Sequence, residues 1–159
     1  MSNLSNNYIA GDWVKGASSI SNINPSNTND VIGEFAQASN SQLEDALNSA
    51  QVAQRQWAAT GLEQRQAVLM KIGEEMMARS AELGELLSRE EGKPVAEGKG
   101  EVYRAGQFFT YYAAEVLRQG GDTADSVRPN IEIDVRREPM GTVAIISPWN
   151  FPTATASIN

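Results

Sequence analysis

The residues best placed to take part in chemistry lie close together, in a polar turn that follows an apolar run. The run, residues 142–146, predicts a buried strand, and the turn carries Asn150 between Pro148 and Pro152. Each proline fixes its own φ and biases the preceding residue toward extended geometry, so the turn has few conformations available. Ligands of open α/β sheets bind at the carboxyl ends of strands. The pattern therefore indicates an active-site edge, although Asn150 also suits a purely structural turn.

The order of several short motifs carries a resemblance to a known family. Residues 146–152 read Ile-Ser-Pro-Trp-Asn-Phe-Pro. Five landmarks precede them: Tyr-Ile-Ala-Gly-Asp-Trp at 8–13, Asn-Pro at 24–25, Glu-Gly-Lys-Pro at 91–94, Tyr-Tyr-Ala at 111–113 and Arg-Glu-Pro-Met-Gly at 137–141. In this order they resemble the N-terminal part of the aldehyde dehydrogenase superfamily. The segments at 111–115, 120–122 and 145–148 are most similar to bacterial 2-oxoglutarate semialdehyde and succinate semialdehyde dehydrogenases.

The resemblance implies oxidation of an aldehyde to a carboxylic acid, with NAD or NADP as the hydride acceptor and a semialdehyde as the favoured substrate. It makes Asn150 a catalytic residue, whose amide donates a hydrogen bond to the substrate oxygen as that oxygen becomes negative. It also places five residues at the cofactor cleft: Ile146, Ser147, Pro148, Trp149 and Asn150. By its chemistry alone, a tryptophan such as Trp149 is more often a core residue than part of a ligand site, so its assignment rests on the resemblance. The choice between the two dinucleotides stays open.

The implied fold class is α/β: the N-terminal portion of an aldehyde-dehydrogenase-like fold, incomplete as given, with a short β-meander, helices and the first strands of an open sheet. Residues 1–128 would belong to the nucleotide-binding domain and residues 129–140 would hold a strand of an oligomerisation element. Residues 141–159 would then form the first buried strand and the active-site turn. Family enzymes are about three times as long. We therefore expect the cysteine nucleophile and the glutamate base to lie outside these 159 residues, the chain alone to be inactive, and the full-length enzyme to be a homo-oligomer.

Composition agrees with a globular protein, since 41% of the residues are hydrophobic and 21% are charged. The net charge of −7 argues against a nucleic-acid partner, whose phosphates require a basic surface. No apolar stretch approaches membrane-spanning length. The first residues lack the basic and apolar segments of a secretory signal, so we expect the cytoplasm as the compartment and no membrane partner. The absence of cysteine excludes disulfides and thiol chemistry within these residues.

No metal site is expected. The resemblance matches Ile23 and Glu91 to positions that help to bind a structural cation in some family members. A lone carboxylate is poor evidence for a cation site. We therefore interpret Glu91 as a helix-terminal residue in solvent.

Hydrophobic periodicity predicts the elements that must hold the turn. Strands are expected at 8–14, 19–23 and 31–36, where β-forming runs alternate with turn residues. Ser41 with Glu44, and Thr60 with Glu63, have the spacing of helix N-terminal capping boxes. Gly92 suits a left-handed helix end and Pro94 a helix start. Helices are therefore predicted at 42–58, 62–79, 81–91 and from 94 toward 120.

Residues 131–135 alternate apolar and polar side chains, the pattern of a strand with one wet face. In the resembling family this segment pairs within an oligomerisation element. A hairpin with residues 142–146 is the alternative, and the sequence does not separate the two. A non-catalytic helical protein that assembles through this strand, or a truncated relic, also remains as an alternative function.

Overall fold

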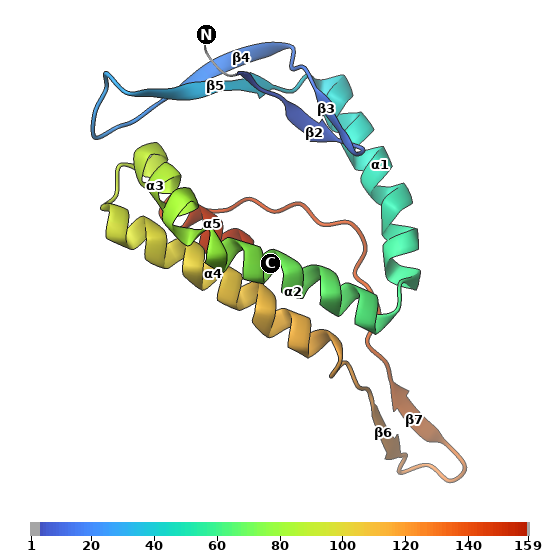
Figure 1. Ribbon diagram of the computed structural model, residues 1–159. Coiled ribbons are helices and arrows are strands. Elements are labelled where there is room, and N and C mark those ends of the chain that lie inside the picture. The colour runs from blue at the N-terminus through green and yellow to red at the C-terminus, as the bar shows by residue number, and fades with distance from the viewer. Residues whose placement is uncertain (1–3, 159) are drawn as a thin grey trace.

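The computed structural model describes residues 4–158 and has a mixed α/β architecture, as predicted. A small N-terminal sheet leads into long helices, and a hairpin precedes a short last helix (Figure 1). In chain order the elements are β1 (Leu4–Ser5), β2 (Asn7–Ile9), β3 (Asp12–Val14), β4 (Ser18–Ile23), β5 (Val31–Gln37), α1 (Asn40–Ala59), α2 (Leu62–Ala78), α3 (Ser80–Glu91), α4 (Val95–Val116), β6 (Asp122–Asp125), β7 (Glu132–Val135) and α5 (Pro152–Ala156).

The N-terminal strands form two separate sheets. Strand β5 pairs in antiparallel fashion with β4 and in parallel fashion with the short β1. Strands β2 and β3 form a hairpin of their own. The prediction of one strand over residues 8–14 is wrong, because Ala10 and Gly11 have φ values of 56° and 95°. Positive φ at two successive residues turns the chain back within two positions, as tight hairpins require.

All four predicted long helices are confirmed, but two of their caps differ from the prediction. The N-cap of α1 is Ser39 rather than Ser41: its hydroxyl accepts from the Gln42 amide at 3.2 Å, and Gln42 Oε1 accepts from the Ser39 amide at 2.9 Å. The glutamine three residues after Ser39 completes this box as well as a glutamate would. Thr60 is not the N-cap of α2: it is the C-cap of α1, its hydroxyl donates to the Gln56 carbonyl, and Gly61 is the N-cap of α2.

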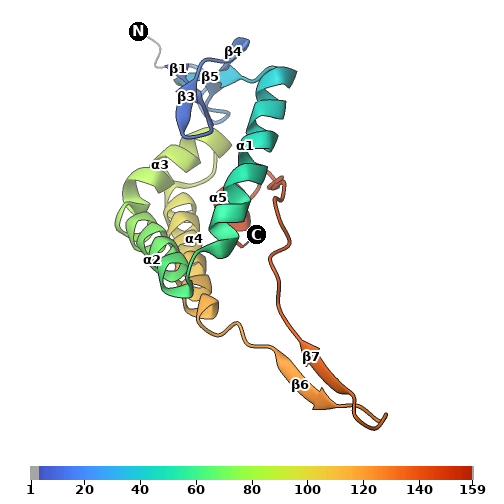
Figure 2. The same ribbon diagram turned by 90° about the vertical axis from the view of Figure 1, so that its right-hand side faces the viewer.

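Helix α4 is the centre of the buried core. It lies beside α2 in both views and also packs against α3 (Figures 1 and 2). The most buried apolar side chains are mostly its own: Val102, Ala105, Ala113 and Val116, joined by Leu87 of α3. Helix α1, in contrast, contains no buried residue. Burial therefore concentrates on one face of α4.

Glycines allow α4 to approach its two neighbours. A Cβ on Gly73 of α2 would stand 2.7 Å from the Gly106 carbonyl oxygen of α4, and a Cβ on Gly106 would meet the Gly73 oxygen at the same distance. Gly84 of α3 and Gly98 of α4 face each other in the same way. Real Cβ atoms do not come so close to backbone oxygen atoms. Backbone therefore contacts backbone at both crossings.

An ion pair joins the N-terminal sheet to α3. The Arg89 guanidinium donates to both oxygens of Asp30, at 2.9 and 2.7 Å, and Asn24 donates to the same carboxylate at 3.1 Å. The hydrogen bonds from Arg89 and Asn24 lower the pKa of Asp30 from 3.8 to about 2. A carboxylate held by a two-pronged guanidinium has a defined geometry. The pair therefore fixes the sheet against the helices.

Strands β6 and β7 pair with each other and project away from the helices in both views (Figures 1 and 2). Of the two alternatives for residues 131–135, the hairpin with residues 142–146 is wrong, since the partner strand is Asp122–Asp125. The sequence does not predict β6, because most of its residues, Asp-Thr-Ala-Asp, have low strand propensity. The side chains of Ile133 and Val135 are exposed. The hairpin therefore adds nothing to the core.

The buried strand predicted at residues 142–146 is not present in the described chain. These residues form no strand, and Val143 and Ile146 are 57% and 94% exposed. A buried parallel strand needs neighbours at its edges and cover on both faces. Residues 4–158 supply neither at this place, so the apolar run stays in solvent.

No helix within residues 4–158 combines the length and apolar character that a membrane span requires.

We predict that replacing Gly106 with alanine destabilises the protein by about 1–3 kcal/mol, the usual effect of overpacking, because the new Cβ would collide with the backbone of α2. Gly100→Ala is the matched control, since Gly100 also lies in α4 but a Cβ there meets nothing within 4 Å. It should stabilise the helix by about 0.5–1 kcal/mol. Urea unfolding measures both, and equal effects of the two substitutions would contradict close helix packing.

The Asp30 pair predicts an acid-sensitive contribution to stability. Because the folded-state pKa of Asp30 lies below its ordinary value of 3.8, the contribution is present above pH 3.8 and is lost as the pH falls toward 2. Asp30→Asn should lower stability at neutral pH and flatten its decline over that window. Unfolding midpoints measured from pH 7 to pH 2 test this. Asp45→Asn, an exposed residue of α1, should leave the profile unchanged.

Candidate active-site turn

The five residues predicted for the site are consecutive and mostly exposed. Ile146 and Trp149 are 94% and 87% exposed, while Ser147 is half-buried. Within the described residues, positions 146–149 make no hydrogen bond with the rest of the chain. Their backbone groups and side chains are therefore free to contact a ligand or another part of the protein, but they form an open edge and not an enclosed pocket.

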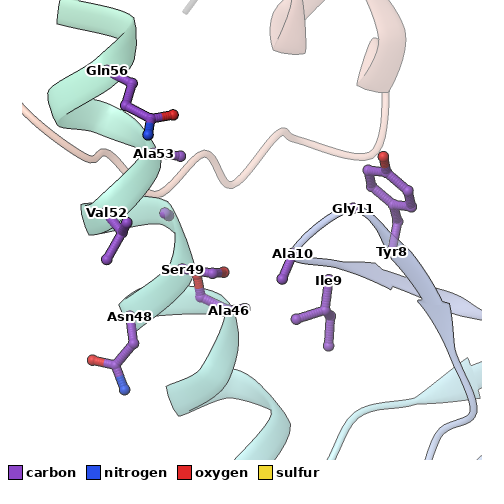
Figure 3. Close-up of a pocket in the computed structure, with 11 residues that line it drawn as sticks. Tyr8, Ile9, Ala10, Gly11, Ala46, Asn48, Ser49, Val52, Ala53 and Gln56 are labelled. Atoms are coloured by element: carbon purple, nitrogen blue, oxygen red, sulfur yellow. The ribbon is translucent and has the colours of Figure 1, made fainter.

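Two surface pockets lie outside the predicted site. One of about 700 Å³ separates α1 from the β2–β3 hairpin and is lined by Ile9, Ala10, Ala46, Ser49 and Ala53, among others (Figure 3). A second, of about 590 Å³, lies between the end of α1 and the start of the apolar run, with Trp57 and Thr142 in its wall. Neither contains a residue of the predicted site.

Asn150 stands at the end of the apolar run, directly before α5. Its side chain is exposed, whereas its backbone carbonyl accepts a hydrogen bond from Lys93 Nζ at 3.1 Å. Phe151, the N-cap of α5, has its ring centroid 4.7 Å from the same nitrogen. The backbone of the turn is thus anchored, and the carboxamide of Asn150 projects toward solvent, where it can donate to a substrate oxygen.

A buried carboxylate holds the other side of the turn. Glu101, in the middle of α4, has a side chain only 1% exposed. Its Oε1 accepts from the amides of Thr153 and Ala154, at 2.9 and 3.2 Å. Its Oε2 lies 2.5 Å from Lys93 Nζ. Both oxygens are therefore occupied, and the first free amides of α5 are satisfied by a negative charge.

Lys93 joins these groups. We name the set the Lys93 cluster; it consists of Glu91, Lys93, Glu101 and the turn residues Asn150 to Ala154. The ammonium lies 2.7 Å from Glu91 Oε2, besides its contacts with Glu101 and the Asn150 carbonyl. Two of these oxygens, Glu101 Oε2 and the Asn150 carbonyl, accept hydrogen bonds from the ammonium, while Glu91 pairs with it by charge. Burial lowers the pKa of Lys93, but its interactions with the carboxylates of Glu101 and Glu91 outweigh burial and raise the pKa overall.

Glu91 differs from its interpretation as a solvated helix end, since its side chain is only 14% exposed and pairs with Lys93. Among the described residues, no group of three or more His, Cys, Asp or Glu side chains could hold a metal ion.

The sequence indicated Lys93 only as part of a landmark and did not indicate Glu101 at all. A signal was available for Glu101. It falls at helical spacing between Gly98 and Ala105, next to Val102, on the buried face of α4. A carboxylate on such a face requires a cation and hydrogen-bond donors, because a buried unpaired charge is very costly. The Lys-Pro pair just before the helix supplies the nearest cation.

This chain is similar to known proteins along most of its length. A model described as the aldehyde dehydrogenase family matches residues 13–159. The α-ketoglutarate semialdehyde dehydrogenase of Haloferax volcanii is 33% identical over 156 residues, which make up 97% of this chain and 32% of that protein. The chain thus spans about a third of the length of this relative.

Two solved structures contain this fold as about a third of their length. An aldehyde dehydrogenase from Brucella melitensis superposes with a TM-score of 0.91 at 32% identity, over 96% of this chain and 32% of that one. A betaine aldehyde dehydrogenase from Staphylococcus aureus, in complex with NAD+, gives a TM-score of 0.89 at 29% identity, over 96% of this chain and 31% of that one.

We predict that Lys93→Met destabilises the protein by about 3–5 kcal/mol, because Glu101 would be left buried without its counter-charge. Since the folded-state pKa of Lys93 is raised above 10.5, the stabilisation by the wild-type pair should be present below pH 10.5 and lost as the pH rises through the folded-state value.

Urea unfolding at neutral and alkaline pH measures this effect. Lys99→Met is the matched control, since Lys99 lies exposed on α4 and has no ion partner among residues 4–158. The control should change stability by about 0.5 kcal/mol or less. Similar effects of the two lysine substitutions would show that Lys93 does not neutralise Glu101.

Proposed function

We propose, because this chain belongs to the aldehyde dehydrogenase family, that the protein containing it oxidises an aldehyde to a carboxylic acid and reduces NAD+ or NADP+. The observation that carries the proposal is the anchored turn: an exposed Asn150 carboxamide at a fixed backbone position, within the motif that the family match includes. The name of the Haloferax volcanii relative supports a semialdehyde as the substrate class.

Asn150 acts in this proposal as a hydrogen-bond donor to the aldehyde oxygen. When a nucleophile attacks the aldehyde carbon, negative charge develops on that oxygen. A donor held in place beforehand stabilises the charge more than it stabilises the uncharged aldehyde, and so lowers the barrier. The carboxamide nitrogen of Asn150 has two N–H groups for this purpose. The nucleophile has to come from outside these 159 residues if it is a cysteine, because the chain contains none.

Residues 146–149 fit one wall of a dinucleotide cleft. Their exposure and the absence of hydrogen bonds to the rest of the described chain leave backbone donors and acceptors for a polar ligand, and Trp149 adds a flat apolar surface. The dinucleotide, when bound, accepts hydride from the substrate. The role of this chain is to position its ring system next to Asn150.

The remaining assignments of the chain follow the same proposal. Residues 1–128 belong to the nucleotide-binding domain, residues 129–140 to an oligomerisation element, and residues 141–159 to the active-site edge. The projecting β6–β7 hairpin, with Ile133 and Val135 exposed, supports the second of these. Exposed apolar side chains on a projecting hairpin are suited to pairing with another subunit. These residues by themselves should be inactive, because they lack a thiol.

The test is Asn150→Ala in the purified full-length protein, with succinate semialdehyde or 2-oxoglutarate semialdehyde and NAD+ or NADP+. Loss of one oxyanion donor should lower kcat about 10²- to 10³-fold, or roughly 3–4 kcal/mol. The aldehyde KM should change little, because the hydrogen bond strengthens only as charge develops. Formation of the reduced dinucleotide, followed by absorbance, gives both constants.

Asn48→Ala, at an exposed position of α1, is the matched control and should leave kcat unchanged. Full activity of Asn150→Ala would contradict the oxyanion role. No turnover of any aldehyde by the wild-type protein, together with self-association, would instead favour the non-catalytic assembly protein.

A further inference from the structure

Along the sequence, Lys93 and Glu101 contact the turn only from the Asn150 carbonyl onward. Upstream, Trp149 and Ile146 are 87% and 94% exposed and bond to nothing in the described chain. Downstream, the Asn150 carbonyl and the amides of Thr153 and Ala154 are all bound to Lys93 or Glu101. The position of Asn150 is therefore determined by two side chains, that of Glu101 in α4 and that of Lys93 just before α4, and not by the apolar run that leads into the turn.

The two anchors lie on either side of Pro152. Glu101 fixes the two amides that follow the proline, and Lys93 fixes the carbonyl that precedes Phe151. Between them, the proline ring restricts one backbone dihedral. A segment held at both ends with a stiff residue between has little freedom to rotate. The Cα of Asn150, and the direction in which its side chain leaves the backbone, are set by this arrangement.

The hydrogen-bond partners of the turn cannot easily be replaced. The Lys93 ammonium donates to Glu101 Oε2 and to the Asn150 carbonyl, and it forms an ion pair with Glu91. Glu101 is 1% exposed, so water does not readily replace either partner. If the ammonium is removed, the Asn150 carbonyl loses its only described side-chain donor. Residue 150 then loses its hydrogen bond to Lys93, while Glu101 of α4 still accepts from the first amides of α5.

We propose that Lys93 and Glu101 are positioning residues for the oxyanion donor: they hold the Asn150 backbone so that its carboxamide faces the reacting oxygen. The inference rests on the proposed function of Asn150 and adds to it the residues through which the rest of the fold controls that donor. Neither Lys93 nor Glu101 contacts the substrate in this proposal. Their effect on the reaction passes through Asn150 alone.

The experiment is a double-mutant cycle in the purified full-length protein. One arm is the paired variant Lys93→Met with Glu101→Gln. It removes the ammonium and the Glu101 charge together, leaves Glu91 with its 14% exposed side chain, and keeps an amide oxygen to accept from Thr153 and Ala154. Removing both members of a buried pair is far less destabilising than removing one. The other arm is Asn150→Ala, and the combined variant carries all three substitutions. For each, kcat and both KM values are measured with a semialdehyde and the preferred dinucleotide.

The paired variant should lower kcat about 10- to 100-fold while both KM values stay within about twofold, since a misplacement of about 1 Å reduces rates on this scale. In the Asn150→Ala background the same pair of substitutions should have no further effect on kcat. A residue that only stabilises the fold would lower kcat by the same factor in both backgrounds. Lys99→Met, the exposed lysine of α4, is the control and should match wild type.

The outcomes distinguish the positioning role of Lys93 and Glu101 from the oxyanion role of Asn150. If Asn150→Ala lowers kcat and the paired variant lowers it equally in both backgrounds, or not at all, the positioning inference is overturned and the oxyanion role stands. If Asn150→Ala leaves kcat intact, the proposed function of Asn150 fails, and the inference fails with it. Thermal unfolding verifies that each variant is folded. Should the paired variant not fold, Glu101→Gln alone replaces it in the same cycle.

Discussion

Helix α4 packs against α2 and α3 only because glycines stand where the helices cross. At Gly73 and Gly106, and again at Gly84 and Gly98, a single methyl group would overlap the facing backbone. Helices that approach so closely leave no room for bulky side chains at the crossing. The most buried apolar residues of α4 are accordingly alanines and valines, Val102, Ala105, Ala113 and Val116, joined by Leu87 of α3. Interior packing at native density makes this spacing a strict requirement.

The close packing of α4 has an electrostatic consequence. Glu101 lies between these crossings on the same face, and the bulk of the neighbouring helices removes it from water. A carboxylate in such a place must be paired. It binds Lys93 and the amides of α5, and these bonds bring the end of the described chain back onto α4. Helix packing, a buried charge and the position of Asn150 thus form one causal sequence.

The sequence predicted those parts of the structure that depend on local chemistry. Gly92 ends α3 with a φ of 80°, as its position before Lys-Pro suggested. The long helices were evident from apolar residues at helical spacing. The sequence failed where a residue depends on distant partners. Ser39 and Ser41 are equally good caps in isolation, and Glu101 gains its role from Lys93 and from amides 52 and 53 positions away.

The apolar run at 142–146 was predicted as a strand from its local pattern, but the described chain offers it no partner strand. Its residues have strand-forming character, yet a strand exists only when another backbone accepts its hydrogen bonds. No described segment does so. The motif that follows the run was recognised from residue identity alone, whereas its anchoring could be seen only once residues 93, 101 and 150 were placed together in space.

The contact between Lys93 and Asn150 closes a loop across 57 positions of sequence, of which α4 is the rigid part and the β6–β7 hairpin with its two connections is the flexible part. The entropy lost on closing a flexible loop grows only with the logarithm of its length. Doubling the flexible part would cost about 0.6 kcal/mol. The hairpin arm can therefore lengthen or shorten by insertion and deletion while the turn that it leads to stays anchored on α4. Evolution can change the reach of the arm without moving Asn150.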